Sequence, residues 1–162
     1  MTVRRIVNAT SADVKEALAS FLYKGITSDD VRQLAMNITD GETEGAPEKV
    51  RQWVMSNFPY VPDPEYAELF ISPVKVVAKY NNGEAIGGDC DDHSLFSGGL
   101  LGSIGYQVRI VLGDTDFDGE IDHAWVEFYS DELKEWLAID TTTNNPIGWK
   151  TEVQRRIEIL PQ

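Results

Sequence analysis

Apolar residues at helical spacing dominate the first forty positions of the chain. From Ser11 to Gly25 they recur three and four residues apart, which is typical of an amphipathic helix. A second run, from Thr27 to Gly41, repeats the spacing and begins with polar residues suited to a helix N-terminus. We therefore expect the first forty residues to be helical, with a loop at 41–47. The apolar positions are Val14, Ala17, Leu18, Phe21, Leu22, Val31, Leu34, Ala35 and Ile38.

Proline and glycine divide the middle of the chain. A third helix is predicted over 48–57, with Pro47 at or near its first turn, and the prolines within 58–64 end it. The apolar segment 73–80 fits either a helix or a strand. One more helix is expected from Asp89 to Gly105. Its middle turns contain glycine and serine, which cost helix stability (about 1 kcal/mol for each Gly), so they indicate a close neighbouring backbone.

The last third of the chain has the composition of strands. Segments 107–112, 123–129 and 136–139 alternate or are rich in β-branched and aromatic residues. The final apolar segment, 152–160, fits a strand or a short helix. Helices followed by consecutive strands indicate the α+β class with an antiparallel sheet. We expect 1–162 to form a single domain, since this length can enclose one core.

Composition narrows the classes of partner. The chain has 14 basic and 27 acidic residues and therefore a net charge of −13. Such a charge repels nucleic acid and anionic membranes. The alternative is that the charge serves only to keep the protein soluble. The sequence has no run of 18 apolar residues, so we predict no membrane-spanning helix. No apolar segment follows the basic residues near Met1, so we predict no signal peptide. The single cysteine fits a reducing, cytoplasmic location.

That cysteine, Cys90, is the strongest candidate for chemistry. It stands at the start of an expected helix, where free N–H groups and the helix dipole favour a thiolate. A thiol nucleophile needs a base and a group that orients the base. His123 begins one predicted strand and Asp140 ends the next, so antiparallel pairing would bring them together. His93 lies along the same helix as the cysteine, where a surface or supporting role is favoured. An isolated cysteine is usually a buried core residue, and the ordered partners argue against that alternative.

The carboxylates around Cys90 oppose formation of its thiolate. Asp89, Asp91 and Asp92 surround it, and negative neighbours raise the pKa of a thiol. Asp89 and Asp92 have the spacing of a capping box, which would turn their charge toward backbone N–H groups. The repulsion by these carboxylates and its relief by the capping box are each on the order of 1–4 kcal/mol. A protonated His123 would decide the balance in favour of the thiolate.

Three motifs resemble one known family. Gly-Asp-Cys90-Asp-Asp-His, Asp-His123-Ala-Trp-Val-Glu and Trp-Leu-Ala-Ile-Asp140-Thr-Thr are similar, in order and element type, to the transglutaminase-like superfamily of papain-fold thiol enzymes. The resemblance runs from about Trp53 to Thr142. It implies a papain-like core in which the cysteine-bearing helix is central and packs on an antiparallel sheet. The small members that the chain resembles most come from bacteria, archaea and bacteriophages.

The resemblance also implies roles for these residues. Cys90 would attack an amide carbonyl, His123 would accept the thiol proton and later give it to the leaving amine, and Asp140 would hold the imidazole tautomer. Water as acceptor gives hydrolysis, and a lysine amine gives a crosslink. The backbone N–H of Cys90 is one oxyanion donor, as for any nucleophile at a helix start. Tyr60 matches a recurrent aromatic residue of the family and is the candidate for the second donor.

An acidic loop before His123 has the Asp-x-Asp-x-Asp-Gly spacing of a calcium loop. Its apolar anchor would be Ile121, but the twelfth position is Trp125 instead of a bidentate glutamate. An acidic hairpin turn is the alternative, since Asp-Gly is a strong turn signal. A bound Ca²⁺ would stiffen the entry to His123. The candidate ligands are Asp114, Asp116, Asp118, Glu120 and Asp122.

Three functions follow. The first is a thiol-dependent acyl-transfer enzyme, more a peptidase or amidase than a crosslinker, acting on proteins or peptides without a required cofactor. The second, compatible with the first, is a structural or assembly protein of a bacteriophage particle, located in the virion. In that case the transglutaminase-like core would be retained in residues 46–162. The helices of residues 1–45, which lie outside the family resemblance, would contact other phage structural proteins. The third is a metal-binding module that uses the acidic loop or the set Asp92, His93 and His123.

Overall fold

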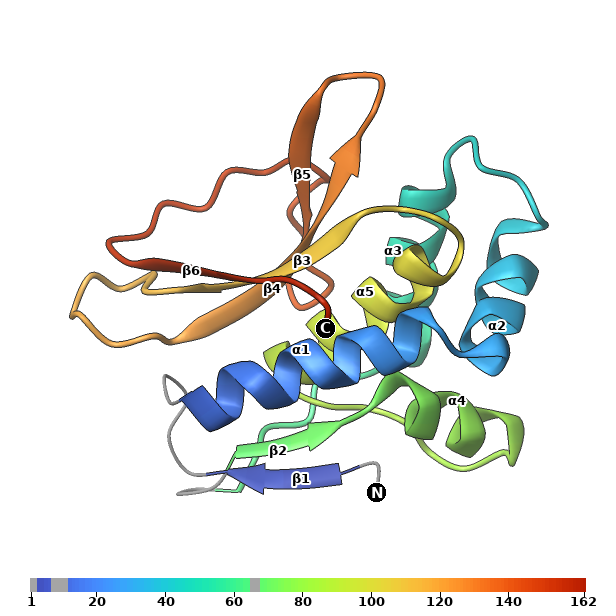
Figure 1. The fold of residues 1–162 in the computed structure, drawn as a ribbon, viewed down its shortest axis with the longest axis horizontal. Helices are drawn as coiled ribbons and strands as arrows, with labels where there is room; N and C mark the ends of the chain where they lie inside the picture. The colour runs from blue at the N-terminus through green and yellow to red at the C-terminus, as the bar shows by residue number, and fades with distance from the viewer. Residues whose placement is uncertain (1–2, 7–11, 65–67) are drawn as a thin grey trace.

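The computed structural model describes residues 3–6, 12–64 and 68–162, and Figure 1 shows the arrangement of its elements. The helices are α1 (Ala12–Ile26), α2 (Asp29–Thr39), α3 (Ala46–Asn57), α4 (Pro73–Asn81) and α5 (Cys90–Ser103). The strands are β1 (Val3–Ile6), β2 (Glu68–Ile71), β3 (Val108–Gly113), β4 (His123–Ser130), β5 (Glu135–Ile139) and β6 (Arg156–Ile159).

Helix α5 is the centre of the fold. It packs against α1, α2, α3 and α4 and against β3 and β4 of the sheet. Its residues from Asp92 to Gly102 are all buried. The small residues in its middle turns make this possible: a Cβ at Gly98 would lie 2.8 Å from Leu22 of α1, and one at Gly99 would lie 2.9 Å from Pro73 of α4. The expected close approach of neighbouring elements is confirmed.

Four strands form one antiparallel sheet in the order β5-β4-β3-β6. The register pairs Val126 of β4 with Ile139 of β5 and with Ile110 of β3, which in turn pairs with Ile159 of β6. Every second residue of β4 faces the core, because side chains alternate along a strand. The α+β class with an antiparallel sheet and a central cysteine-bearing helix is confirmed, and the final segment 152–160 contains a strand.

The N-terminal segment differs from the expectation. Residues Val3–Ile6 form strand β1, which pairs antiparallel with β2, so the prediction that the first forty residues are helical is wrong there. A four-residue strand whose partner lies more than sixty residues away leaves no local signal in the sequence. The apolar segment at 73–80 is helical as α4, with Ser72 as N-cap and Pro73 in the first turn, where its missing N–H costs nothing.

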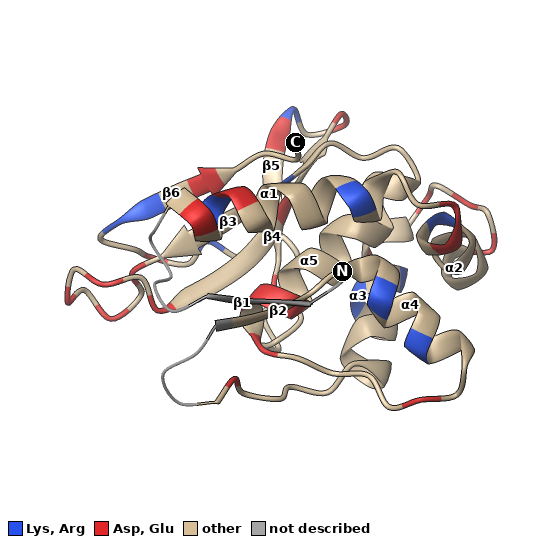
Figure 2. Ribbon diagram, turned by 60° about the horizontal axis from the view of Figure 1, so that its bottom comes forward, with Lys and Arg blue, Asp and Glu red and all other residues tan. Residues whose placement is uncertain are grey.

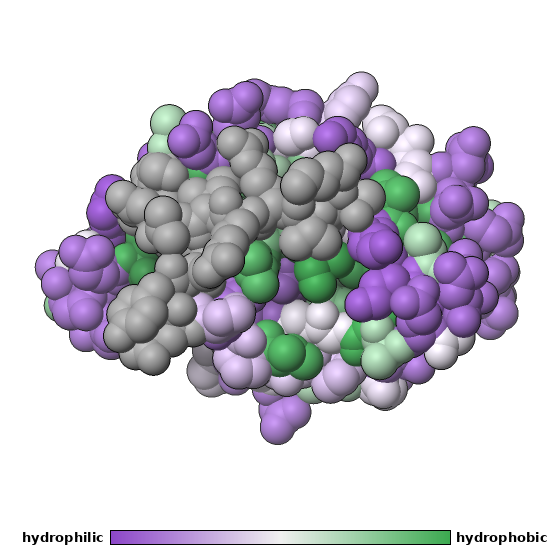
Figure 3. All heavy atoms as spheres, turned by 90° about the horizontal axis from the view of Figure 1, so that it is seen from below, coloured by the Kyte–Doolittle hydropathy of each residue, from purple (hydrophilic) through white to green (hydrophobic). Residues whose placement is uncertain are grey.

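Charge and apolar surface are distributed unevenly. Acidic residues gather in loops such as the one between β3 and β4, as Figure 2 shows. On the face that lies at the bottom of Figure 1, the apolar side chains outside the grey atoms stand among polar ones (Figure 3). None of the helices in the described part of the chain has the length and apolar character that crossing a bilayer requires.

Candidate active site

Cys90 is the first residue of α5, and a capping box fixes the start of that helix. The Asp89 carboxylate accepts hydrogen bonds from the backbone N–H groups of Asp91 (3.1 Å) and Asp92 (3.4 Å). The Asp92 carboxylate accepts one from the N–H of Asp89 at 3.3 Å. The spacing predicted this box, and it holds the Cys90 backbone at a defined helix end. The Cys90 side chain is half-buried against the core.

A short stretch of extended chain lies beside the approach to Cys90. The N–H of Gly88 donates to the carbonyl of Pro59 (3.1 Å), and the N–H of Val61 donates to the carbonyl of Gly88 (2.8 Å). These bonds bring Tyr60 next to Gly88, two residues before the cysteine. A Cβ at Gly88 would collide with the side chain of Asp92, so the close approach requires glycine.

Tyr60 lies partly exposed above His93, with ring centroids 6.3 Å apart. Burial raises the pKa of its hydroxyl, and the charges of Cys90 and Asp89 raise it further. The hydroxyl therefore keeps its proton and remains a donor. The structure brings Tyr60 into the neighbourhood of Cys90, and its part in an oxyanion hole stays a prediction.

His123 and Asp140 meet at the end of the sheet. His123 is the first residue of β4, Asp140 directly follows β5, and the two strands are neighbours. The Nε2 atom of His123 lies 2.6 Å from Oδ2 of Asp140. The other carboxylate oxygen, Oδ1, accepts from the hydroxyl of Thr142 at 2.6 Å and from its N–H at 3.0 Å. One carboxylate oxygen of Asp140 is thus held by Thr142 in the following turn, and the other binds the imidazole of His123.

The environment of Asp140 keeps it ionised. Burial raises the pKa of this carboxyl, but the hydrogen bond and charge of His123, together with the Thr142 bonds, outweigh burial and lower the pKa below its usual value. An ionised Asp140 fixes the proton of the neutral imidazole on Nε2. The opposite ring nitrogen, Nδ1, is then the one able to accept a proton.

A second contact ties this pair to the first turn of α5. His93 is 3 % exposed, and its Nδ1 atom lies 2.7 Å from the hydroxyl of Thr141, the residue after Asp140. Burial lowers the pKa of His93 to about 4, although Asp140 and the Pro59 carbonyl act to raise it. His93 is therefore neutral near pH 7. A surface position for His93 is wrong, and its role is to connect the cysteine-bearing helix to the end of β5.

Carboxyl groups crowd the start of α5. Oxygen atoms of Asp63, Asp89 and Asp92 all lie within 4.8 Å of one another. Burial raises the pKa of Asp89 to about 10, and the neighbouring carboxyl groups add to this shift. Burial also raises the pKa of Asp92, to about 7, although hydrogen bonds from Ile71 and Asp89 act to lower it. At neutral pH such a group retains a proton or attracts a cation. The sequence did not identify Asp63, because nothing in its proline-rich segment indicates where the side chain points.

The acidic loop between β3 and β4 forms a second cluster. Carboxylate oxygens of Asp114, Asp116 and Asp122 lie within 4.8 Å of one another, whereas Asp118 and Glu120 are not part of this group. The buried Asp114 accepts from the N–H groups of Asp118 (3.2 Å) and Gly119 (2.7 Å). The pKa of Asp116 is raised to about 6 by desolvation and by its hydrogen bond with Asp114. Calcium ligation by these residues stays a prediction.

The arrangement has the parts of a thiol acyl-transfer site. Cys90 begins α5, which packs on β4, where His123 is the first residue. Strand β4 pairs with β5, which the ionised Asp140 directly follows, and Asp140 binds the His123 imidazole. The His93–Thr141 contact places the residue after Asp140 beside the helix turn that Cys90 begins. Thr141 had no sequence signal, since a threonine after a strand is an ordinary turn residue.

Comparison with known proteins agrees with this description. The family model for the transglutaminase-like superfamily matches residues 32–141. The match begins inside α2, earlier than residue 46, where the sequence suggested that the core starts; the division at 45/46 stays a prediction. A search of curated proteins found no match.

Solved structures share the fold at low sequence identity. A candidate cysteine protease from Cytophaga hutchinsonii has a TM-score of 0.57 and 16% identity and covers 89% of this chain and 50% of its own. A candidate protease from Parabacteroides distasonis has a TM-score of 0.53 and 15% identity, over 82% of this chain and 26% of its own. The chain thus spans half of one of these proteins and about a quarter of the other. By the match of the family model over 32–141, the chain belongs to the transglutaminase-like superfamily.

Proposed function

We propose that this protein is a thiol-dependent acyl-transfer enzyme that cleaves amide bonds in peptides or proteins. Cys90 is the nucleophile, His123 the general base and acid, and Asp140 the group that orients the base. The observation that carries the proposal is the 2.6 Å hydrogen bond between His123 Nε2 and Asp140 Oδ2. Superfamily membership and the candidate proteases of similar fold support a hydrolase.

The tautomer sets the direction of proton transfer. With Nε2 engaged by Asp140, Nδ1 of His123 takes the proton from the Cys90 thiol. The sulfur attacks the amide carbonyl, and the tetrahedral intermediate collapses to a thioester as the amine leaves with that proton. Water then attacks the thioester, His123 accepts its proton, and the acid departs as the thiol is restored. A lysine amine in place of water would instead give a crosslink.

The negative oxygen of both intermediates needs donors. The backbone N–H of Cys90 is one, as for any nucleophile at the start of a helix. Tyr60 is the proposed second donor, since its raised pKa keeps the hydroxyl protonated. Its exposed fraction of 55% also leaves the ring accessible to substrate.

Alkylation tests the proposal without knowledge of the substrate. Because Cys90 is the only cysteine, iodoacetamide can label only one thiol, and mass spectrometry follows its rate. We expect a rate near pH 6 at least about tenfold above that of glutathione, because an imidazolium at His123 favours the thiolate. A rate that follows glutathione from pH 5 to pH 9 would overturn the proposal.

Two histidine variants provide matched controls. His123→Ala should reduce the alkylation rate near pH 6 to that of a model thiol. His93→Gln removes the other histidine but retains side-chain atoms able to bond Thr141, so it should leave the rate within about twofold of wild type. Equal losses in both variants would contradict the assignment of His123 as the base.

We further propose that the loop before His123 binds Ca²⁺. Asp114, Asp116 and Asp122 supply oxygen ligands of the kind that Ca²⁺ prefers. A cation among them would relieve their mutual repulsion. It would also stiffen the chain that enters β4, and so the position of His123.

The alternative role in assembly stays a prediction. The helices α1 and α2 pack on α5, so they have a structural task within the fold and are not free appendages. A role in a phage particle would therefore require a surface of these helices that α5 leaves uncovered.

A further inference from the structure

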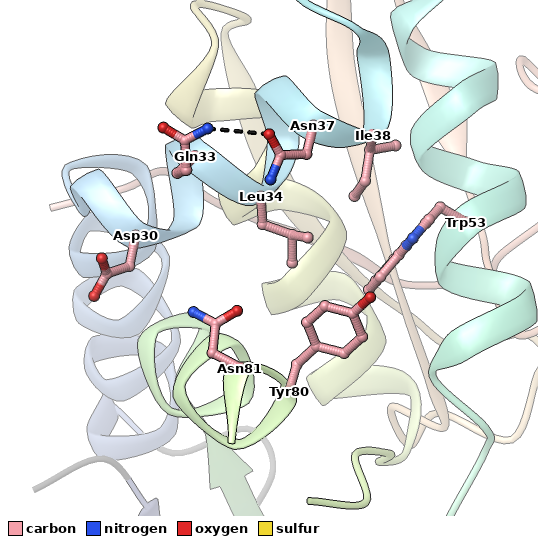
Figure 4. A pocket seen from close by; sticks show the side chains of 8 residues that line it. All are labelled: Asp30, Gln33, Leu34, Asn37, Ile38, Trp53, Tyr80 and Asn81. Carbon is pink, nitrogen blue, oxygen red and sulfur yellow. Dashed lines mark hydrogen bonds between the residues drawn. The ribbon is translucent and has the colours of Figure 1, made fainter. Parts of the chain in front are cut away.

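A cavity on the helical side of the molecule lies outside the site described above. It has a volume of about 330 Å³ and is formed by α2, α3 and α4 (Figure 4). Such a size is at the lower end of small-molecule sites in proteins. Its lining residues are Asp30, Gln33, Leu34, Asn37, Ile38, Trp53, Tyr80 and Asn81.

Apolar side chains form one part of this cavity. Leu34 points into it from α2, with Tyr80 and Trp53 beside it, as Figure 4 shows. The rings of Trp53 and Tyr80 meet edge to face with centroids 5.2 Å apart, and Trp53 also contacts Phe96 of α5 at 6.0 Å. These contacts fix Trp53 against the core, so this wall is formed before any ligand arrives.

Polar side chains stand around the apolar part. Gln33 and Asn37 come from α2, where Gln33 donates to Asn37 at 3.0 Å, and Asn81 comes from α4 across the opening. Asp30 is the only charged residue among those that line the cavity. Each amide carries both a donor and an acceptor, whereas Asp30 can only accept.

This combination restricts the chemistry of a ligand. An anion would meet Asp30 with no lining cation to balance it, within a chain of net charge −13. An ammonium group would pair with Asp30 but could accept no hydrogen bond from the side-chain amides, which would bond only to each other and to water. A proline-rich peptide would satisfy the amide N–H groups through its carbonyls but present no donor to Asp30. Hydroxyl groups both donate and accept, so a neutral polyhydroxyl ligand has the groups needed to bond all four polar residues.

We propose that the cavity between α2, α3 and α4 binds a neutral sugar ring. The hydroxyl groups face Asp30, Gln33, Asn37 and Asn81, and the apolar C–H face of the ring packs on Tyr80 and Leu34. The glycan could be free or attached to a peptide. The cavity takes no part in the chemistry at Cys90. Sugar binding there can therefore be tested independently of the proposed enzyme function.

Titration of the ¹⁵N-labelled full chain with cellobiose and with N,N′-diacetylchitobiose tests the proposal. We expect saturable shifts of the Trp53 indole N–H and of the side-chain amides of Asn37 and Asn81 with at least one of these sugars. Trp53→Phe assigns the indole signal. Asn37→Ala and Asn81→Ala should each weaken binding about fivefold to tenfold, as the loss of one or two hydrogen bonds predicts. Both side chains are exposed, so neither change should unfold the protein.

Gln52→Ala is the matched control, because Gln52 is an exposed amide on α3 that does not line the cavity, and its variant should bind as wild type. Parallel titrations use methylammonium and a proline-rich peptide. No saturable shift with either sugar, or shifts at these residues with methylammonium or the peptide alone, would overturn the sugar assignment. Shifts that occur only at residues outside the cavity would do the same.

Discussion

The buried His93 makes the stability of this protein sensitive to acid. Its pKa in the folded chain is about 4, against an ordinary value of 6.5, because burial disfavours the charged ring. Between those values the unfolded chain binds a proton that the native state does not bind. Stability contributed by a neutral His93 is therefore complete above pH 6.5 and is lost as the pH falls toward 4.

The expected size of this effect follows from the shift. A lowering of 2.5 pKa units corresponds to about 3 kcal/mol in full, and about 2 kcal/mol of it is lost between pH 7 and pH 5. His93→Gln removes the titrating ring, while its amide can still pair with the hydroxyl of Thr141. Other titrating groups are common to both proteins, so the difference between them isolates His93.

Urea unfolding followed by tryptophan fluorescence at pH 7 and pH 5 measures the effect. Wild type should lose about 2 kcal/mol more than His93→Gln over this interval. Equal losses in the two proteins would refute the reasoning, because they would mean that His93 takes up its proton in the folded state as readily as in the unfolded one.

Other substitutions test packing, hydrogen bonding and metal binding. Gly99→Ala should lower the free energy of unfolding by about 1–3 kcal/mol in urea, since its Cβ would lie 2.9 Å from Pro73; an unchanged midpoint would contradict the packing described. Thr141→Val should cost about 1–3 kcal/mol by the same measurement, because it leaves the buried Nδ1 of His93 without its partner. Millimolar Ca²⁺ should raise the melting temperature of wild type and of Asp131→Asn, whereas Asp116→Asn should not respond; an equal rise in Asp116→Asn would exclude the predicted site.

Local pattern predicted those parts of the fold that local interactions determine. The capping residues around Cys90 and the spacing of α1 and α2 specify helices with little help from the rest of the chain. Strands β3, β4 and β5 follow one another and pair in sequence as antiparallel neighbours, so their order was also predictable, whereas β6 returns to pair with β3. These elements carry the cysteine, the histidine and the aspartate.

The remaining features depend on contacts between distant segments. Strand β1 has no amphipathic pattern, and only its pairing with β2 defines it. The partner of His93 is 48 positions away, so its burial could not be read from its own helix. Asp63 joins Asp89 and Asp92 only because the chain around Tyr60 lies beside Gly88. Spacing therefore identified the candidate residues but not the polar groups that support them.

The raised pKa values of Asp89 and Asp92 bear on the reactivity of Cys90. A carboxyl that keeps its proton places no negative charge beside the sulfur, so Asp89 and Asp92 oppose the thiolate much less near pH 6 than two ionised aspartates would. The same shift has a consequence for stability. An aspartate whose folded pKa is raised gives stability that is complete below its unfolded pKa and is lost as the pH rises through the folded value.

Asp92→Asn tests this account, because asparagine imitates the neutral carboxyl. Asp92 is 2% exposed and its pKa is about 7, so wild type should lose about 1 kcal/mol more than the variant between pH 6 and pH 8.5. Urea unfolding with EDTA present measures the difference without a cation on the cluster. An identical pH dependence in the two proteins would mean that Asp92 is already ionised at pH 6. The thiolate would then have to form beside a full negative charge, and His123 and the start of α5 together would have to outweigh that charge.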